Sequence, residues 1–312
     1  MIKEVIGMKK PTKRCLVIYN PKSGRGLKAE QVKEYKQIFI DRGFDAEFYA
    51  TKKKNDATTA TYKAKGFDIV FAIGGDGTLN EVVKGNFDRK EKMAICPIPN
   101  GTCNDVASML GYSGTPAENI AAALDGNEKT FDIGTINGTP FVYVVGMGKF
   151  MNIPYDTKNE EKKKMGYFAY LKDGVIEFTE KLKRYKAEVT LDGEKLDDYY
   201  SLIMVSNANH IAGINKFHRD VILNDGKFEV LLCKAAKKRH LIFNFLKFLL
   251  GRKNKFISTK ASEINIKLSA KPDKKWCIDG EKFEYDGKEY NIKVAEQMKF
   301  LVPKEKTKEL FK

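Results

Sequence analysis

The chain has 312 residues, which is enough for one large domain or two ordinary ones. Apolar residues make up 42% of it, enough to fill a proper core, so the composition excludes an intrinsically disordered protein. Its five widely spaced cysteines and three histidines favour neither a disulfide framework nor a histidine-based metal site. The formal charge of +15 predicts partners that carry phosphate, namely nucleotides, nucleic acid or an anionic membrane surface.

No segment of the sequence predicts a transmembrane helix. The longest apolar stretch, 241–250, is interrupted by Asn244 and Lys247, whereas a bilayer requires about 20 apolar residues. The first residues, MIKEVIGMKKPTKR, lack the apolar centre of a signal peptide. We therefore expect a cytoplasmic protein.

The first half of the chain alternates between strand and helix patterns. Strands are predicted at 15–19, 45–50, 68–73 and 93–98, and helices at 29–42, 56–65, from Thr78 onward, 104–110 and 117–124. Thr78 and Glu81 have the spacing of a capping box at the start of the third helix. Strands that alternate with helices of this length predict a parallel sheet covered on both faces.

After about Asp132 the pattern changes to strands joined by tight turns. Asn-Gly and Asp-Gly pairs predict hairpins at 137–138, 192–193, 279–280 and 286–287. The strands are predicted at 141–145, 187–191, 201–206, 228–232, 264–268 and 290–294, with one helix near 237–250. We expect an α/β protein with a Rossmann-like parallel-sheet domain at 1–133 and an antiparallel β-sandwich domain at 134–299. The C-terminal residues 300–312 can return to the first domain.

A glycine-rich turn, Gly74-Gly75-Asp76-Gly77-Thr78, lies between a buried strand and a helix. In a parallel sheet this is the carboxyl edge, where ligands bind. Glycines let the backbone approach an anion closely, and the helix N-terminus offers free N–H groups. Because the Asp76 carboxylate repels phosphate, the turn implies Mg²⁺ or a hydroxyl-bearing ligand. The alternative is an ordinary β–α turn with a solvated aspartate.

Two more turns follow strands in the same way, at 20–26 and 99–105. The first carries Ser23 and two cations that could hold phosphate oxygens, although it lacks the residue order of a Walker A loop. A simple connecting loop is the alternative for this turn. Three such turns at one sheet edge could surround a triphosphate.

The motifs of these turns, together with two later motifs, resemble those of a known protein family. NPKSGRG, GGDGTLNEVVKG, PNGTCNDVASMLG, FDIG and WCIDGE stand in the order seen in the diacylglycerol kinase catalytic family, over roughly residues 13 to 302. NAD kinases share GGDGT, and the PNGTCND block favours the lipid kinases. The resemblance implies an NAD-kinase-like N-terminal domain, ATP as co-substrate, Mg²⁺ as cofactor, and diacylglycerol or a related lipid alcohol as acceptor.

The resemblance also implies site residues. Asp76 would organise the metal-bound phosphates, and Asp225, with the backbone carbonyls near Ile222 and Lys227, resembles a structural Mg²⁺ loop. That loop has Asn224 where the family usually has a second acid, which weakens the expected metal affinity. The ATP-binding positions are Asn20, Pro21, Lys22, Ser23, Gly24, Thr51, Gly74, Gly75, Asp76, Gly77, Thr78, Leu79, Asn80 and Thr102.

Glu281 matches the general base proposed for the family, which would accept the proton of the attacking hydroxyl. Asp279 is a candidate helper. The residues alone leave an alternative open, because the same Asp-Gly-Glu string occurs at 192–194; the family alignment selects 279–281. Lys149 stands where the family often has a small or acidic residue, which could alter the acceptor pocket.

The stretch from Lys237 to Lys255 joins basic clusters to apolar residues. It is either a membrane-contact helix or a buried helix with solvated flanks, and we favour the buried helix. We expect peripheral contact with an anionic membrane, no nucleic-acid partner and, as an open alternative, a homodimer. The other functions considered are an NAD kinase and a catalytically silent lipid- or nucleotide-binding regulator.

Overall fold

The structure of the chain is a computed structural model. It describes residues 13–24, 26–148, 151, 183–212, 214–215, 217–218, 220–234, 238–273, 275–304 and 308–312.

The N-terminal half is built on a parallel sheet. Its strands are β1 (Lys13–Tyr19), β2 (Phe44–Ala50), β3 (Ile69–Gly74) and β4 (Ala94–Pro99). They lie in the order β4-β3-β1-β2 and pair in parallel. Every residue of β3 is buried, as expected of a strand that is covered on both faces.

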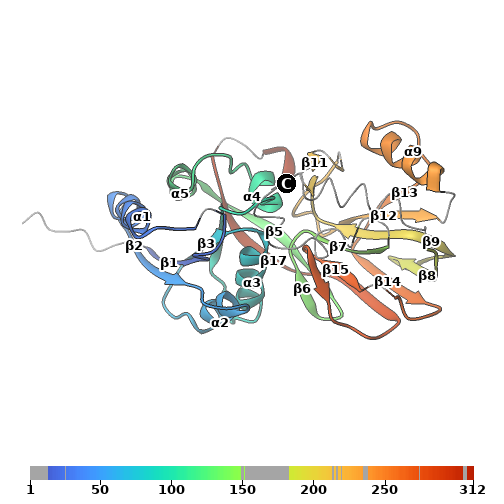
Figure 1. The fold of residues 1–312 in the computed structure, drawn as a ribbon, viewed down its shortest axis with the longest axis horizontal. Helices are drawn as coiled ribbons and strands as arrows, with labels where there is room; N and C mark the ends of the chain where they lie inside the picture. Colours follow the sequence, from blue (N-terminus) through green and yellow to red (C-terminus); the bar gives the residue numbers. More distant parts are fainter. Residues whose placement is uncertain are drawn as a thin grey trace, which may run out of the picture.

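Helices cover the two faces of this sheet (Figure 1). The helix α1 packs against α5 on one face, and α2 packs against α3 on the other. On the first face Phe39 contacts Phe71 of β3 edge to face, with ring centroids 4.9 Å apart. The bounds are α1 (Ala29–Asp41), α2 (Asp56–Lys63), α3 (Asp76–Phe87), α4 (Asp105–Met109) and α5 (Pro116–Leu124).

The predicted capping box at Thr78 and Glu81 is wrong. The helix α3 begins at Asp76, with Gly75 as its N-cap. The Glu81 carboxylate instead accepts hydrogen bonds from the backbone N–H groups of Asn55, at 2.9 Å, and Ala57, at 3.1 Å. These donors lie at the start of α2, so Glu81 caps the neighbouring helix rather than its own.

The C-terminal half is rich in antiparallel strands. The long strand β9 pairs with β7, β8 and β12, and Trp276 and Tyr290 pack against each other in the core that these strands enclose. The bounds are β5 (Asn127–Ile136), β6 (Thr139–Phe141), β7 (Val144–Gly148), β8 (Tyr185–Leu191), β9 (Glu194–Ser206), β10 (His210–Ile211), β11 (Ile214–Asn215), β12 (Phe228–Lys234), α9 (Lys238–Leu249), β13 (Ile257–Ala261), β14 (Glu263–Leu268), β15 (Trp276–Ile278), β16 (Glu281–Phe283), β17 (Glu289–Val302) and the short 3₁₀ helix Lys308–Leu310.

Three of the four predicted hairpins are confirmed. Turns at 137–138, 192–193 and 279–280 join paired strands, and both residues of each turn have positive φ. The hairpin at 286–287 is wrong, because β16 ends at Phe283 and does not pair with β17. There the Tyr285 ring stacks on Phe283 and lies against Gly287, so this segment forms a longer loop.

The strand β17 links the two halves. It pairs antiparallel with β14 and β5, and Phe300 lies parallel to Ile95 of β4. The last long strand therefore reaches the N-terminal sheet, and the strands of both halves form one connected sheet, apart from β10 and β11, which pair only with each other. These features confirm an α/β fold with a parallel N-terminal part and a β-rich C-terminal part, while the division at residue 133 stays a prediction.

None of the helices within the described ranges is long and apolar enough to cross a membrane.

Candidate active site

A cavity of about 680 Å³ lies between the carboxyl edge of the parallel sheet and the β-rich half. The predicted site residues that line it are Asn20, Lys22, Ser23, Thr51, Gly75, Asp76, Gly77, Thr78, Asn80, Thr102, Asp279 and Glu281. The structure thus brings together most residues of the predicted ATP site and both acids of the Asp-Gly-Glu turn. The predicted site residues that do not line it are Pro21, Gly24, Gly74, Leu79, Asp225, Ile222 and Lys227.

The turns at this edge are packed directly against one another. The Ser23 hydroxyl donates a hydrogen bond to the Asn100 carbonyl at 2.9 Å. Gly24 has a φ of +55°, and a Cβ there would lie 2.4 Å from the same carbonyl oxygen. A Cβ on Gly101 would lie 2.6 Å from the Cα of Gly75. Gly24 therefore belongs to the scaffold of the cavity rather than to its lining.

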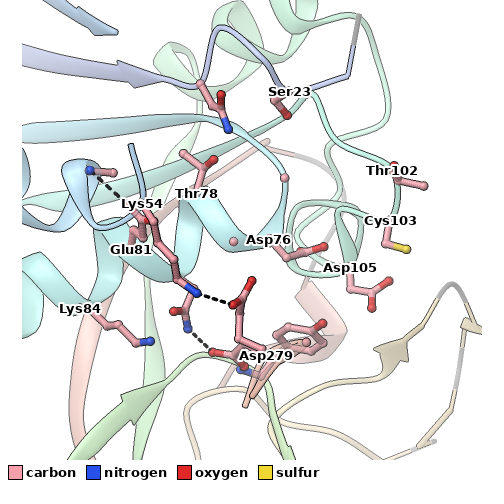
Figure 2. A pocket seen from close by; sticks show the side chains of 18 of the residues that line it. Ser23, Lys54, Asp76, Thr78, Glu81, Lys84, Thr102, Cys103, Asp105 and Asp279 are labelled. Atoms are coloured by element: carbon pink, nitrogen blue, oxygen red, sulfur yellow. Dashed lines mark hydrogen bonds and ion pairs between the residues drawn. The ribbon is translucent and has the colours of Figure 1, made fainter. Parts of the chain in front are cut away.

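Asp76 begins α3 and points toward Asp105 of α4 (Figure 2). Burial, and then the charge of Asp105, raises the pKa of Asp76 to about 7. The Asp105 carboxylate is itself buried, where it accepts a hydrogen bond from the backbone of Ala212 at 2.7 Å and lies 3.5 Å from His210. Two buried carboxylates at the starts of neighbouring helices repel each other, and a bound cation would relieve this repulsion.

Asp105 belongs to the third predicted turn, 99–105, but was not singled out there as a site residue. It could have been identified as a site residue because it is acidic and ends a turn at the same sheet edge as Asp76. Its partners His210 and Ala212 are remote in sequence and could not be identified from that turn.

Asp279 is held entirely by protein donors. Its carboxylate accepts hydrogen bonds from the Asn80 side chain at 2.5 Å and from the backbone N–H groups of Val142, Tyr143 and Val144 at 2.7, 3.0 and 3.1 Å. Burial raises its pKa, and the three backbone donors oppose that shift. This network ties the turn before Glu281 to α3, which is a positioning role.

Glu281 begins β16, immediately after that turn. Its carboxylate forms an ion pair with Lys54 at 2.8 Å. The pair raises the pKa of Lys54. Because the Glu281 side chain is 51% exposed, it can be reached by a substrate that enters the cavity.

Lysines surround the cavity. Lys22 was predicted as part of the site, whereas the run at 52–54 directly after β2 was not. Their ammonium groups favour anionic ligands such as the phosphates of a nucleotide. The lysines that line the cavity are Lys22, Lys52, Lys53, Lys54, Lys84 and Lys282.

Asp76 and Asp105 fit a divalent metal that arrives with a nucleotide. Among the described residues no group of three or more His, Cys, Asp or Glu side chains is placed to hold a metal ion. A metal held by these two carboxylates would take its other ligands from phosphate oxygens and water, which is how Mg²⁺ usually binds in kinases.

Lys149, which was expected to alter the acceptor pocket, lies outside the described residues.

The predicted Mg²⁺ loop lies away from the cavity, just before β12. The Asp225 carboxylate accepts a hydrogen bond from the backbone of Lys227 at 3.1 Å and pairs with the Lys260 ammonium at 3.3 Å. A cationic side chain thus faces the carboxylate that was predicted to bind the metal.

A parallel sheet with glycine-rich turns and lysines at its carboxyl edge is typical of nucleotide-dependent phosphotransferases, and comparison with known proteins narrows the class. Residues 14–136 match the model of the diacylglycerol kinase catalytic domain. The chain is 32% identical over 310 residues to diacylglycerol kinase of Bacillus subtilis (strain 168), covering 96% of this chain and 99% of that protein. It is 30% identical over 281 residues to diacylglycerol kinase of Staphylococcus aureus (strain JH9), covering 88% and 87% of the two.

The fold agrees with these relatives. A solved structure from Bacillus anthracis str. Sterne aligns with a TM-score of 0.79 and 26% identity, over 94% of this chain and 96% of that one. The chain belongs to the diacylglycerol kinase family. It is an ATP-dependent kinase of this type, and in general terms a lipid kinase that uses a divalent metal.

Proposed function

We propose that the protein transfers the γ-phosphoryl group of ATP to the hydroxyl of diacylglycerol or a closely related lipid alcohol. Mg²⁺ is the proposed metal and Glu281 the proposed general base. The observation that carries this proposal is that Asp76 and Glu281, from opposite halves of the chain, line the same cavity.

The two sides of the cavity differ in chemistry. The N-terminal half contributes Lys22, Lys54 and Asp76 together with the glycine-rich turns, which suit a nucleotide with a metal on its phosphates. The C-terminal half contributes mostly apolar groups, which suit the glycerol and upper acyl region of a lipid. These groups belong to Tyr143, Val144, Met151, Ile211 and Cys277.

In the proposed reaction the N-terminal half binds the phosphates and the C-terminal half supplies the general base. Lysines and the N-terminus of α3 hold the phosphates, and Asp76 with Asp105 would hold a divalent metal that supplies charge neutralisation there. The Glu281 carboxylate accepts the proton of the acceptor hydroxyl as its oxygen bonds to the γ-phosphorus, and the bond to the ADP oxygen breaks. Asp279 holds the turn that places Glu281 and takes no part in the proton transfer.

We also propose that the protein reaches its lipid by docking on an anionic membrane through α9. Phe243, Leu246 and Leu250 are 58%, 52% and 63% exposed on one side of this segment, at helical spacing. On its other side Phe245 and Phe248 pack against Phe217. The segment is therefore only half buried, and its free apolar side with nearby Lys247 suits an anionic interface.

The decisive experiment presents ATP, Mg²⁺ and diacylglycerol in anionic mixed micelles, with NAD in a parallel reaction, and identifies the products by mass. Phosphorylated lipid that is lost in Glu281→Gln supports the proposal. Phosphorylated NAD without phosphorylated lipid would instead make the protein an NAD kinase. Turnover of neither acceptor would contradict the proposed acceptor and favour the catalytically silent regulator.

A further inference from the structure

A second cluster of charges lies outside the active site, between the strands β12 and β13. The Lys260 ammonium is 3.3 Å from Asp225 and 3.2 Å from Glu229. Glu229 and Lys260 lie directly opposite each other in the antiparallel pair, so their side chains share one face of the sheet. Asp225 reaches the same ammonium from the loop that precedes β12.

Both carboxylates of this cluster are removed from water. The side chains of Asp225 and Glu229 are only 9% and 6% exposed, whereas that of Lys260 is 30% exposed. Within the described part of the chain, neither Glu229 oxygen accepts a hydrogen bond of good geometry. Burial raises the pKa of Glu229 to about 7, and the Lys260 ammonium opposes that shift by stabilising the charged carboxylate.

The loop is also held by hydrogen bonds to other segments. The backbone N–H of Gly226 donates to Asp132 of β5 at 2.6 Å. Asn224 donates to the Thr130 hydroxyl at 3.2 Å, and its side-chain oxygen accepts from the backbone of Lys312 at 2.8 Å. The residue that departs from the family pattern thus binds β5 and the C-terminal segment. These contacts hold the loop against β5 and the C-terminal segment without a metal.

We propose that the ammonium of Lys260 is the resident cation of the 222–227 loop, in the place where the sequence motif implies a structural Mg²⁺. The loop of this protein is then independent of divalent metal. This inference concerns stability and does not rest on the proposed reaction. An experiment that refutes one of the two proposals therefore does not refute the other.

The first test uses the wild-type protein without nucleotide. The melting temperature is measured with EDTA and with Mg²⁺, and Mg²⁺ in the desalted protein is measured by elemental analysis. We expect the same melting temperature in both buffers and no bound Mg²⁺. A melting temperature that falls in EDTA, together with loss of this sensitivity in Asp225→Asn, would overturn the proposal.

The second test removes the cation. Lys260→Met leaves two buried carboxylates uncompensated, so we expect a melting temperature lower by about 5 °C or more. Lys260→Arg is the matched control, because it keeps the charge and should retain most of the stability. An unchanged melting temperature in Lys260→Met would contradict the proposal. If this variant does not fold, the comparison of wild-type melting temperatures in EDTA and in Mg²⁺ still tests the proposal.

Discussion

The Glu281 carboxylate lies 2.8 Å from the Lys54 ammonium, in an ion pair that joins residues 227 positions apart in the chain. Both side chains are exposed, so the pair contributes little to stability. Its effect is geometric, because it holds the proposed base at the rim of the cavity, beside a cation that can also contact phosphate.

Glu281→Gln should lower kcat by about 100-fold or more, since general bases typically contribute about 10² to 10⁴ in rate. The substitution preserves size and removes the proton acceptor, so the KM for ATP should change little. Steady-state kinetics in mixed micelles provide the measurement. A kcat close to that of the wild type would exclude Glu281 as the base.

Lys54→Met tests whether Lys54 acts through Glu281. We expect a smaller loss of kcat than in Glu281→Gln, and little further loss when the two substitutions are combined, because residues in contact have non-additive effects. The double-mutant cycle on kcat/KM measures this coupling. Fully additive losses would mean that Lys54 does not act through Glu281.

Asp279→Asn should destabilise the protein by about 2 to 4 kcal/mol, because an amide cannot accept all the hydrogen bonds that the buried carboxylate now accepts. Asparagine tolerates the positive φ of 46° at this position, so the loss would report the hydrogen bonds rather than backbone strain. Urea unfolding measures the effect. Asp286→Asn, on the surface, is the control and should leave the free energy of unfolding unchanged. Equal stability of both variants would refute the positioning role.

The pKa of Asp76 predicts how stability depends on pH in the absence of metal and nucleotide. Burial raises this pKa from 3.8 to about 7, so between these values the folded protein holds a proton that the unfolded chain has lost. The contribution of Asp76 to the free energy of unfolding therefore falls as pH rises through this window and levels off above it. Urea unfolding in EDTA between about pH 5 and about pH 8 measures the slope. Asp76→Asn should remove this contribution, and an identical slope in both proteins would contradict it.

The exposed side of α9 can be tested by vesicle binding. Changing Phe243 and Leu246 together to serine should weaken binding to anionic vesicles by about tenfold or more, because each apolar side chain contributes about 1.5 to 3 kcal/mol when fully buried. Ile40→Ser on α1 is the control, since Ile40 is exposed to a similar degree on another helix. High salt should also weaken binding of the wild-type protein. Unaltered binding by the double variant would refute docking through α9.

Local patterns in the sequence predicted local structure well. The strands around the glycine-rich turns and the hairpins at 137–138, 192–193 and 279–280 follow from periodicity and turn chemistry, which depend on neighbouring residues. The capping box failed because Glu81 found its donors at the start of α2. A residue at helical spacing can bind a nearer partner from another segment, and the sequence does not show that partner.

In the site, too, the sequence reveals residues within one turn but not their partners from distant segments. Asp76 and its turn could be identified from the sequence, because glycines and an acid between strand and helix have a direct chemical meaning. The contacts of Asp105 with Ala212, and of Lys54 with Glu281, join distant segments. Such pairs depend on how the two halves of the chain meet, which no local pattern encodes.

Because β17 lies near the C-terminal end of the sequence, the sheet that it joins can be completed only late in synthesis. Its partners β4 and β5 are made long before it, since they lie in the first half of the sequence. Until β17 emerges, the outer edge of β4 has no strand beside it, and an open edge can pair with the wrong segment or with another chain. The parallel sheet that is made first is therefore completed only when β17 has been made, and the edge of β4 stays open until then.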